Sequence, residues 1–282
     1  MQILVTGHKG LIGSEIERAL CDQGHSVVGF DRVSGDDVRD LASLERAALG
    51  CGAVIHAAAL LGQAGERADE IMAVNLLGTW NVLSAAESAR IERVVYFSSA
   101  SVLGVFKGQA PPAYLPLDDA YPCRPTTPYG ISKLLAEQMC KLFTHRTGIT
   151  TICLRPPGVF DQGTYRAIRD ARRADPQFEW TPYWEYGAFL DVRDVASAAL
   201  CALERPVPRH AVRQGSRHTT FLLCAQDISS ATKTSLELVQ QIHPDVHWRG
   251  GKAYALEPFR ALIDTTRAQE VLGWQPVYKW RD

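Results

Sequence analysis

The chain has 282 residues, of which 46% are hydrophobic, and its 30 basic and 31 acidic side chains leave a formal net charge of −1. This length and composition allow one large buried core with a smaller lobe, while the balanced charge gives no reason to expect nucleic acid or an anionic membrane as a partner. No apolar run approaches the ~20 residues that cross a bilayer, so we expect no membrane span.

The seven cysteines are widely spaced, and no Cys-x-x-Cys occurs. We therefore expect buried free thiols of a reducing cytoplasm rather than disulfides or a metal site. The first strand candidate, Ile3-Leu4-Val5, begins at once. We accordingly expect no signal peptide and a cytoplasmic protein.

Short apolar runs alternate with helical periodicity over the first 155 residues. The strand candidates are 3–5, 26–30, 53–56, 93–97 and 151–154, and the helical stretches include 12–20, 73–83 and 131–142. Short, continuously apolar strands are typical of a sheet that is buried on both faces. The alternation of strand and helix predicts an α/β fold with a doubly wound parallel sheet, the Rossmann fold.

A glycine-rich turn follows the first strand candidate, with Gly7, Gly10 and Gly13 at three-residue spacing. Such glycines let the backbone approach a pyrophosphate, which the N–H groups of the next helix can bind. Asp31 ends the second strand, where a carboxylate can accept hydrogen bonds from the adenosine ribose. It would repel a 2′-phosphate, which favours NAD over NADP. The adjacent Arg32 either reverses part of this preference or is a solvated strand end.

Tyr129 and Lys133 are four residues apart and share one face of a predicted helix. A tyrosine with a pKa near ~10 is a poor base at neutral pH, but a neighbouring ammonium and an oxidised nicotinamide lower that pKa. Tyr129 can then take a proton from a substrate hydroxyl while hydride leaves the same carbon. Ser99 ends a strand at the carboxyl edge of the sheet, and we expect it to hydrogen-bond the reacting oxygen. The alternative for the Tyr-Lys spacing alone is a surface helix pair.

The pattern loosens after Arg155, where prolines and aromatic residues accumulate. We expect a dinucleotide-binding domain and a smaller α/β substrate-binding lobe. The dinucleotide-binding domain should comprise residues 1–155, with 188–204 packing on it. The substrate-binding lobe should comprise residues 156–187 and 205–282.

Arg166, Arg169 and Arg173 share a predicted helix face in the lobe. They either clamp a substrate carboxylate or phosphate, with Arg166 as the preferred candidate, or form a solvated basic face. The aromatic residues that follow either pack on the substrate or belong to the core. They are Phe178, Trp180, Tyr183, Trp184 and Tyr186.

This arrangement resembles the extended short-chain dehydrogenase/reductase family, the NAD-dependent epimerase/dehydratase group. The further matching segments are Asp37-Val38, His56-Ala57-Ala58-Ala59, the helix around Asn75, Leu154-Arg155-Pro156, 191–196 and 272–276. The resemblance implies that Ser99, Tyr129 and Lys133 form the catalytic triad, with Lys133 also holding the nicotinamide ribose. The cofactor contacts it implies, with no metal, are Gly7, Gly10, Leu11, Ile12, Gly13, Asp31, Arg32, Asp37, Val38, Ala57, Ala58, Ala59, Asn75, Tyr129, Lys133 and Pro156.

Departures from the family pattern bear on the substrate. Nucleotide-sugar dehydratases carry an Asp-Glu pair where this chain has Ala100 and Ser101, so we do not expect a dehydratase. Ser101 also stands where GDP-fucose synthases carry a cysteine. Gly158 replaces an asparagine that is usual among members that bind nucleotide sugars. Uronate dehydrogenases resemble this chain in compactness and use a free sugar acid.

We therefore expect an NAD-dependent enzyme, with NADP as the alternative cofactor, that acts as an oxidoreductase or epimerase on a sugar or nucleotide-sugar hydroxyl. One alternative is net oxidation of a free sugar acid, or another carbonyl reduction. A further alternative is a non-catalytic NAD(P)-binding sensor. The resemblance also implies a homodimer formed through the helices that follow Asn75 and Tyr129.

Overall fold

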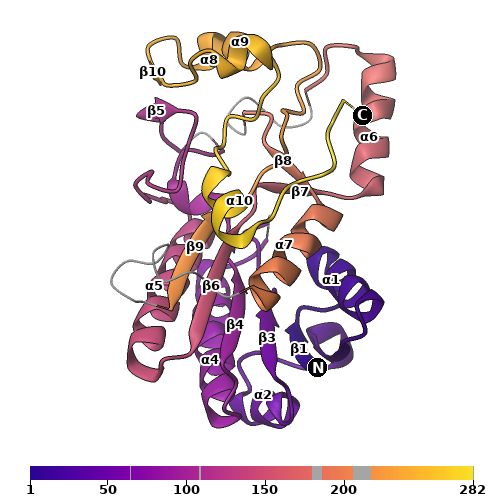
Figure 1. Cartoon of the computed structure of the whole chain (residues 1–282), viewed down its shortest axis with the longest axis vertical. Helices are drawn as coiled ribbons and strands as arrows, with labels where there is room; N and C mark the ends of the chain where they lie inside the picture. Colours follow the sequence, from indigo (N-terminus) through magenta and orange to yellow (C-terminus); the bar gives the residue numbers. More distant parts are fainter. Residues whose placement is uncertain (64, 108, 180–185, 206–216, 282) are drawn as a thin grey trace.

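The computed structural model describes residues 1–63, 65–107, 109–179, 186–205 and 217–281 (Figure 1). Its centre is a six-stranded sheet with the strand order β2-β1-β3-β4-β6-β9, in which every neighbouring pair is parallel. The strands are β1 (Gln2–Thr6), β2 (Ser26–Phe30), β3 (Ala53–His56), β4 (Arg93–Phe97), β6 (Thr150–Arg155) and β9 (His218–Leu222). The prediction of a doubly wound parallel sheet is confirmed.

Helices cover both faces of this sheet. One face carries α1 (Leu11–Asp22), α7 (Val192–Glu204) and α10 (Thr266–Leu272), and the other carries α2 (Leu41–Ala48), α4 (Gly78–Ser88) and α5 (Pro128–Thr147). Successive strand residues point to opposite faces. Ile3 and Val5 therefore pack in the core under α1 and α7, whereas Leu4 packs under α2 and α4. Two buried faces explain why the strands are continuously apolar.

A smaller lobe lies beyond the carboxyl edge of the sheet (Figure 1). Its elements are β5 (Tyr114–Leu115), which pairs with β10 (His247–Trp248), the helices α8 (Ser235–Ile242) and α9 (Ala253–Leu256), and α6 (Gln162–Ala174), which follows β7 (Gly158–Phe160). The strand β7 pairs with β8 (Phe189–Asp191). A separate apolar cluster that includes Leu117, Ile228 and Leu262 fills the interior of this lobe.

The position of the strand β9 differs from the one expected from the domain boundaries. It lies within 205–282, the range assigned to the lobe, but it pairs with β6 in the main sheet. The reason is that Phe221 of β9 is fully buried in the same core as α7 and α10. Within the described ranges, no helix combines the length and apolar character needed to cross a bilayer.

Candidate active site

A cavity of about 380 Å³ opens at the carboxyl edge of the sheet. Its walls come from the segments that follow β1, β3, β4 and β6, together with one residue of α5. The lining residues are Gly7, Gly10, Leu11, Ile12, Gly13, Ala57, Ala59, Leu61, Ser98, Ser99, Ala100, Ser101, Phe106, Lys107, Tyr129, Pro156, Pro157, Gly158 and Val159. The strand order reverses between β1 and β3, and open α/β sheets bind ligands at such a reversal.

The glycine turn lies against one wall of this cavity. Gly7 has a φ of +74°, and a Cβ atom at this position would lie 2.7 Å from the backbone nitrogen of Ala58. A Cβ atom at Gly13 would lie 2.0 Å from the carbonyl oxygen of Gly7. The helix α1 begins after Gly10 without a side-chain cap. Its first N–H groups are therefore available to an anion, and the close backbone packing fits a pyrophosphate.

Asp31 ties the glycine turn to the end of β2. Its carboxylate accepts hydrogen bonds from the backbone N–H groups of Lys9 (3.0 Å) and Val33 (2.9 Å). The cavity lining does not include Asp31 or Arg32, nor the pair Asp37 and Val38. None of these four residues therefore lies in the cavity wall. Asp31 contacts the glycine turn at Lys9, whereas Val38 lies against α4, where its carbonyl oxygen accepts a hydrogen bond from Asn81 (3.1 Å).

Tyr129 enters the cavity from the first turn of α5. This helix begins at Pro128, and the Thr127 hydroxyl accepts a hydrogen bond from the N–H of Gly130 (3.2 Å), which is a favourable helix start. Ser99 lies in the same cavity, and its hydroxyl accepts a hydrogen bond from the N–H of Ser101 (3.1 Å). Burial raises the pKa of Tyr129, and the Ser99 hydroxyl acts in the opposite direction. The predicted tyrosine and serine therefore share one cavity.

Lys133 lies behind the cavity wall, one helical turn after Tyr129. Its Nζ donates a hydrogen bond to the carbonyl oxygen of Phe97 (2.7 Å) and lies 4.9 Å from the ring centre of Tyr96 and 5.8 Å from that of Tyr129. Burial lowers the pKa of Lys133 to about 7, although the nearby Glu137 carboxylate opposes this shift. The ammonium group therefore gains or loses its proton near neutral pH.

Asn75 joins the loop after β3 to α5. It lies in a π-helical turn (Ala73–Leu77) between α3 (Ala68–Met72) and α4, and such turns are frequent at functional sites. Its side-chain oxygen accepts from the N–H of Leu60 (2.9 Å), and its side-chain nitrogen donates to Ser132 Oγ (2.9 Å). Ser132 Oγ in turn donates to the carbonyl oxygen of Tyr129 (2.8 Å). Asn75 thus positions the backbone at Tyr129, although its own side chain does not line the cavity.

Arg155 and His56 were named in the sequence only as parts of matching segments, and their buried contacts were not predicted. Arg155 donates to both oxygens of Glu137 (2.8 and 2.6 Å); burial opposes the charge of Arg155, but the hydrogen bonds to Glu137 raise its pKa. His56 hydrogen-bonds Thr6 Oγ1 (2.6 Å) and Thr79 Oγ1 (3.0 Å), and burial, together with the charge of Lys133, lowers its pKa to about 3. A buried ion pair and a neutral histidine therefore lie beneath the cavity.

The three arginines proposed as a substrate clamp lie on the exposed face of α6, away from the cavity lining. Tyr165 and Ile168 form the buried face of this helix, and Arg173 pairs with Asp170 (2.7 Å). All three side chains, those of Arg166, Arg169 and Arg173, are exposed. Their exposure agrees with the alternative expectation, a solvated basic face.

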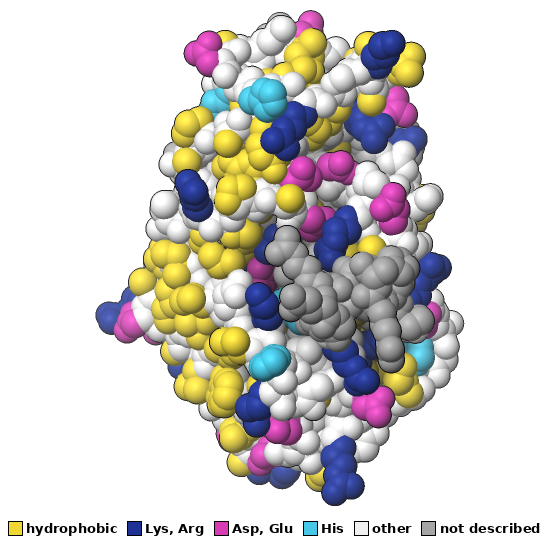
Figure 2. Space-filling model, turned by 60° about the vertical axis from the view of Figure 1, so that its left-hand side comes forward, with side chains coloured by type: hydrophobic (Ala, Val, Ile, Leu, Met, Phe, Trp, Pro, Cys, Tyr) yellow, Lys and Arg dark blue, Asp and Glu magenta, His cyan; other side chains and the backbone are white. Residues whose placement is uncertain are grey.

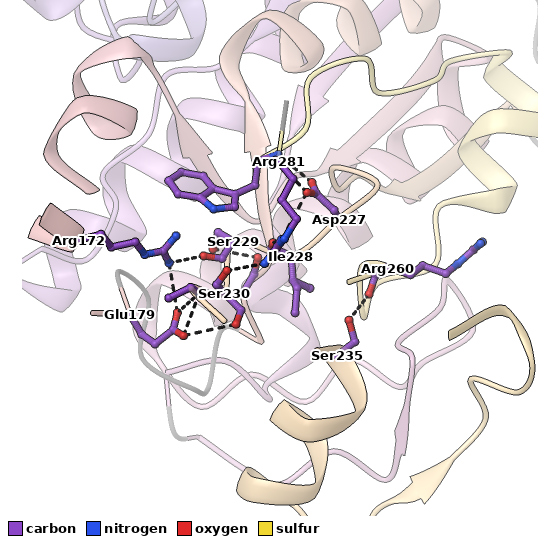
Figure 3. Close-up of polar contacts among 12 residues, drawn as sticks. Arg172, Glu179, Asp227, Ile228, Ser229, Ser230, Ser235, Arg260 and Arg281 are labelled. Carbon is purple, nitrogen blue, oxygen red and sulfur yellow. Dashed lines mark hydrogen bonds and ion pairs between the residues drawn. The ribbon is translucent and has the colours of Figure 1, made fainter. Parts of the chain in front are cut away.

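Arg172, which was not singled out, is the arginine of α6 that makes buried contacts. It donates to the carbonyl oxygen of Ser229 (2.5 Å) and pairs with Glu179 (3.4 Å) (Figure 3). Among the aromatic residues, Trp180, Tyr183 and Trp184 lie outside the described residues. Tyr186 is buried, and its hydroxyl hydrogen-bonds His243 (3.2 Å), so its role is in the core.

Comparison with known proteins identifies a family and several relatives of this chain. The model of the NAD dependent epimerase/dehydratase family matches residues 3–213. A putative UDP-glucose 4-epimerase of Methanocaldococcus jannaschii is 27% identical over 97% of this chain and 93% of its own length.

Two solved structures have the same fold. A short-chain dehydrogenase/reductase superfamily protein from Agrobacterium tumefaciens with bound NAD has a TM-score of 0.70 at 22% identity, over 100% of this chain and 94% of its own. A UDP-glucose 4-epimerase from Thermotoga maritima with UDP-glucose has a TM-score of 0.69 at 20% identity, over 99% of this chain and 94% of its own.

Proposed function

Because this chain belongs to the NAD dependent epimerase/dehydratase family, we propose that it is an NAD-dependent oxidoreductase or epimerase that acts on a hydroxyl of a sugar or nucleotide sugar. The observation that carries this proposal is the shared cavity. Tyr129 and Ser99 line the same cavity as the glycine turn, and the Lys133 Nζ lies 5.8 Å from the Tyr129 ring centre. An acid/base group is thus beside a cradle for a dinucleotide.

The glycine turn supports NAD as the cofactor. The backbone at Gly7, Gly10 and Gly13 would hold the pyrophosphate. A Cβ atom at Gly7 or Gly13 would collide with backbone, and one at Gly10 would lie 3.3 Å from the Gly7 carbonyl oxygen, so the turn leaves its backbone open to a ligand. Asp31, already fixed by the N–H groups of Lys9 and Val33, would accept hydrogen bonds from the adenosine ribose. When bound, NAD supplies the acceptor for hydride. The Agrobacterium structure, which has the same fold, holds NAD.

The chain's own residues would move the proton. Tyr129 would accept the proton of the substrate hydroxyl at its phenolic oxygen, and Ser99 would hold the same substrate oxygen by a hydrogen bond. In its protonated form, Lys133, whose Nζ lies 5.8 Å from the Tyr129 ring centre, would favour the phenolate of Tyr129. Asn75 and Ser132 would keep this part of α5 in place.

The comparisons favour a sugar nucleotide as substrate, since the Methanocaldococcus relative and the Thermotoga structure are named for UDP-glucose. Ala100 and Ser101, which line the cavity beside Ser99, supply no acid or base for the elimination of water. Epimerisation or oxidation therefore fits better than dehydration. A free sugar acid remains the second candidate, because Gly158, which also lines the cavity, supplies no side chain to bind a nucleotide.

The proposed function is tested by following NADH absorbance with a panel of uronic acids, free sugars and nucleotide sugars, with NADP in parallel. Stoichiometric NADH release identifies a dehydrogenase and its substrate class. Conversion of one sugar into its epimer, detected by NMR without NADH release, identifies an epimerase. The proposal fails if neither signal appears with any member of the panel.

A Tyr129→Phe variant should bind NAD normally but lose turnover by a factor of about 10²–10⁴, the usual contribution of an acid/base group. Tyr114→Phe is the matched control, because that hydroxyl bonds Asp118 (2.8 Å) in the lobe and should leave turnover unchanged. Full turnover in Tyr129→Phe would contradict the assigned role and favour a sensor that only binds the cofactor.

A further inference from the structure

The described part of the cavity wall carries one ionised side chain. Among the described residues that line the cavity, Lys107 alone is charged at neutral pH, and the others are glycine, alanine, serine, proline, aliphatic or aromatic residues. No carboxylate is among these described lining residues to neutralise it. The amine of Lys133 lies buried behind the wall. Lys107 therefore gives the described part of the cavity wall a positive charge.

The ammonium of Lys107 is available to a ligand. Its side chain is exposed, and neither an ion pair nor a side-chain hydrogen bond joins it to another described residue. By contrast, Lys133 is buried against the carbonyl oxygen of Phe97. The exposed arginines of α6, Arg166 and Arg169, are absent from this lining. Of the described cations, Lys107 is thus the one best placed to contact a bound substrate.

The position of Lys107 is fixed by its surroundings. The preceding Phe106 is 3% exposed in the core of the lobe. The side-chain amide of Gln109 donates to the carbonyl oxygen of Phe106 (3.0 Å) and accepts from the N–H of Thr126 (2.8 Å). Thr126 lies just before the helix that carries Tyr129, so the segment with the cation is tied to the segment with the acid/base group.

The backbone at Lys107 supports a functional role. Its φ is +54°, in the left-handed region that residues with a Cβ atom seldom adopt. Such a conformation costs free energy, and it persists where the surrounding structure enforces it, often at a ligand site. Phe106 and Gln109 supply that enforcement here.

We propose that Lys107 binds an anionic group of the substrate, either the carboxylate of a sugar acid or a phosphate of a nucleotide sugar, and so selects anionic over neutral sugars. This inference rests on the proposed function. An ammonium binds either anion as a point charge. The cofactor's pyrophosphate has its own donors in the N–H groups of α1, while Lys107 follows β4 on the same segment as Ser99. Lys107 therefore belongs to the substrate side of the cavity.

The test compares Lys107→Gln and Lys107→Arg with the unmodified protein. Loss of the charge should raise KM for the anionic substrate by about 10- to 100-fold, leave kcat within a few-fold, and leave the Kd of NAD unchanged. The arginine variant should restore most of the affinity. Lys252→Gln is the control, because it removes an equal charge from an exposed residue of the lobe that is absent from the cavity lining.

The substrate panel distinguishes the two anions. An effect on D-glucuronate or D-galacturonate, with D-glucose and D-galactose unaffected, identifies a carboxylate, whereas an effect on UDP-glucose alone identifies a phosphate. An unchanged KM in Lys107→Gln overturns the inference, and so does an equal loss of affinity for NAD.

Direct binding separates this inference from the proposed function. If the unmodified protein turns over no sugar, the function proposal fails. Calorimetry of D-glucuronate and UDP with the NAD-loaded protein then still tests Lys107. Binding that Lys107→Gln weakens supports the inference, and no binding of either anion overturns it.

Discussion

Gly13 lies where the first turn of α1 passes the glycine turn. A Cβ atom there would be 2.0 Å from the Gly7 carbonyl oxygen and 2.7 Å from the His8 Cα, both of which are backbone atoms. A Cβ atom at Gly29, on the neighbouring strand, would also come too close, at 2.5 Å, but it would meet the imidazole ring of His8. The backbone atoms near Gly13 can move away from a Cβ atom only if the whole turn moves, whereas the His8 ring near Gly29 can rotate.

This contrast gives a prediction at the residue scale. Gly13→Ala should weaken NAD binding by at least about tenfold, because the turn that would hold the pyrophosphate has to open. Gly29→Ala should retain most of the affinity, because only the His8 ring has to move. Fluorescence titration with NAD measures both, with circular dichroism to show that each variant is folded. Equal affinities in the two variants would contradict the assignment of the turn to the pyrophosphate.

At the scale of elements, the segment after α10 is held by carboxylates rather than by a strand partner. Asp194, buried at the start of α7, accepts hydrogen bonds from the N–H groups of Val277 (3.0 Å) and Tyr278 (3.0 Å). Asp227 accepts from the N–H groups of Trp280 (2.9 Å) and Arg281 (3.2 Å). The Arg281 side chain also reaches the carbonyl oxygens of Ile228 and Ser230 (Figure 3). These contacts fasten the C-terminal segment to both the main domain and the lobe.

Asp194 should make the free energy of unfolding dependent on pH. Burial raises its pKa from 3.8 to about 6, and the hydrogen bonds from Val277 and Tyr278 offset only part of this shift. Because the pKa of Asp194 is higher in the folded protein than in the unfolded chain, the protonated carboxyl favours the folded state. Its contribution to the free energy of unfolding is fully present below about pH 4 and is lost as the pH rises through about 6. Relative to Asp194→Asn, the free energy of unfolding should therefore fall by up to about 3 kcal/mol over this range. Urea unfolding at pH 4.5 and 7.5 measures the difference, and parallel changes in both proteins would refute it.

Local sequence signals predicted much of the fold. The strand β1, the glycine turn and the start of α5 each follow from residues that are adjacent in the chain, because capping and tight turns are short-range effects. The Glu137–Arg155 pair joins residues 18 apart, and it depends on how α5 packs on β6. The place of Lys107 in the cavity depends on a backbone angle that no residue type prescribes. Interactions set by tertiary packing are therefore the part that the sequence did not predict.

At the scale of the whole molecule, apolar side chains remain exposed on α4 and α5. Leu142 is 68% exposed, and Leu135, one repeat earlier on the same face of α5, is 47% exposed. Trp80 on α4 is 44% exposed, and its ring packs edge-on against Phe143. Hydrophobic side chains also gather on the left flank of the molecule in Figure 2. Large exposed apolar patches are typical of interfaces, and we propose that two copies of the chain associate through these helices.

Leu142→Glu should convert such a dimer into a monomer, because two copies of a buried carboxylate would have to lose their hydration at the interface. Leu256→Glu is the matched control: Leu256 is 84% exposed, but it lies on α9 in the lobe, so this variant should remain dimeric. Light scattering on the size-exclusion peak gives the mass of each protein, with 31.1 kDa expected for one chain. A monomeric unmodified protein, or a dimer that tolerates Leu142→Glu, would show that this face is not the interface. Because Tyr129 and Leu142 share α5, the turnover of Leu142→Glu, measured beside its mass, shows whether activity depends on the association of two chains.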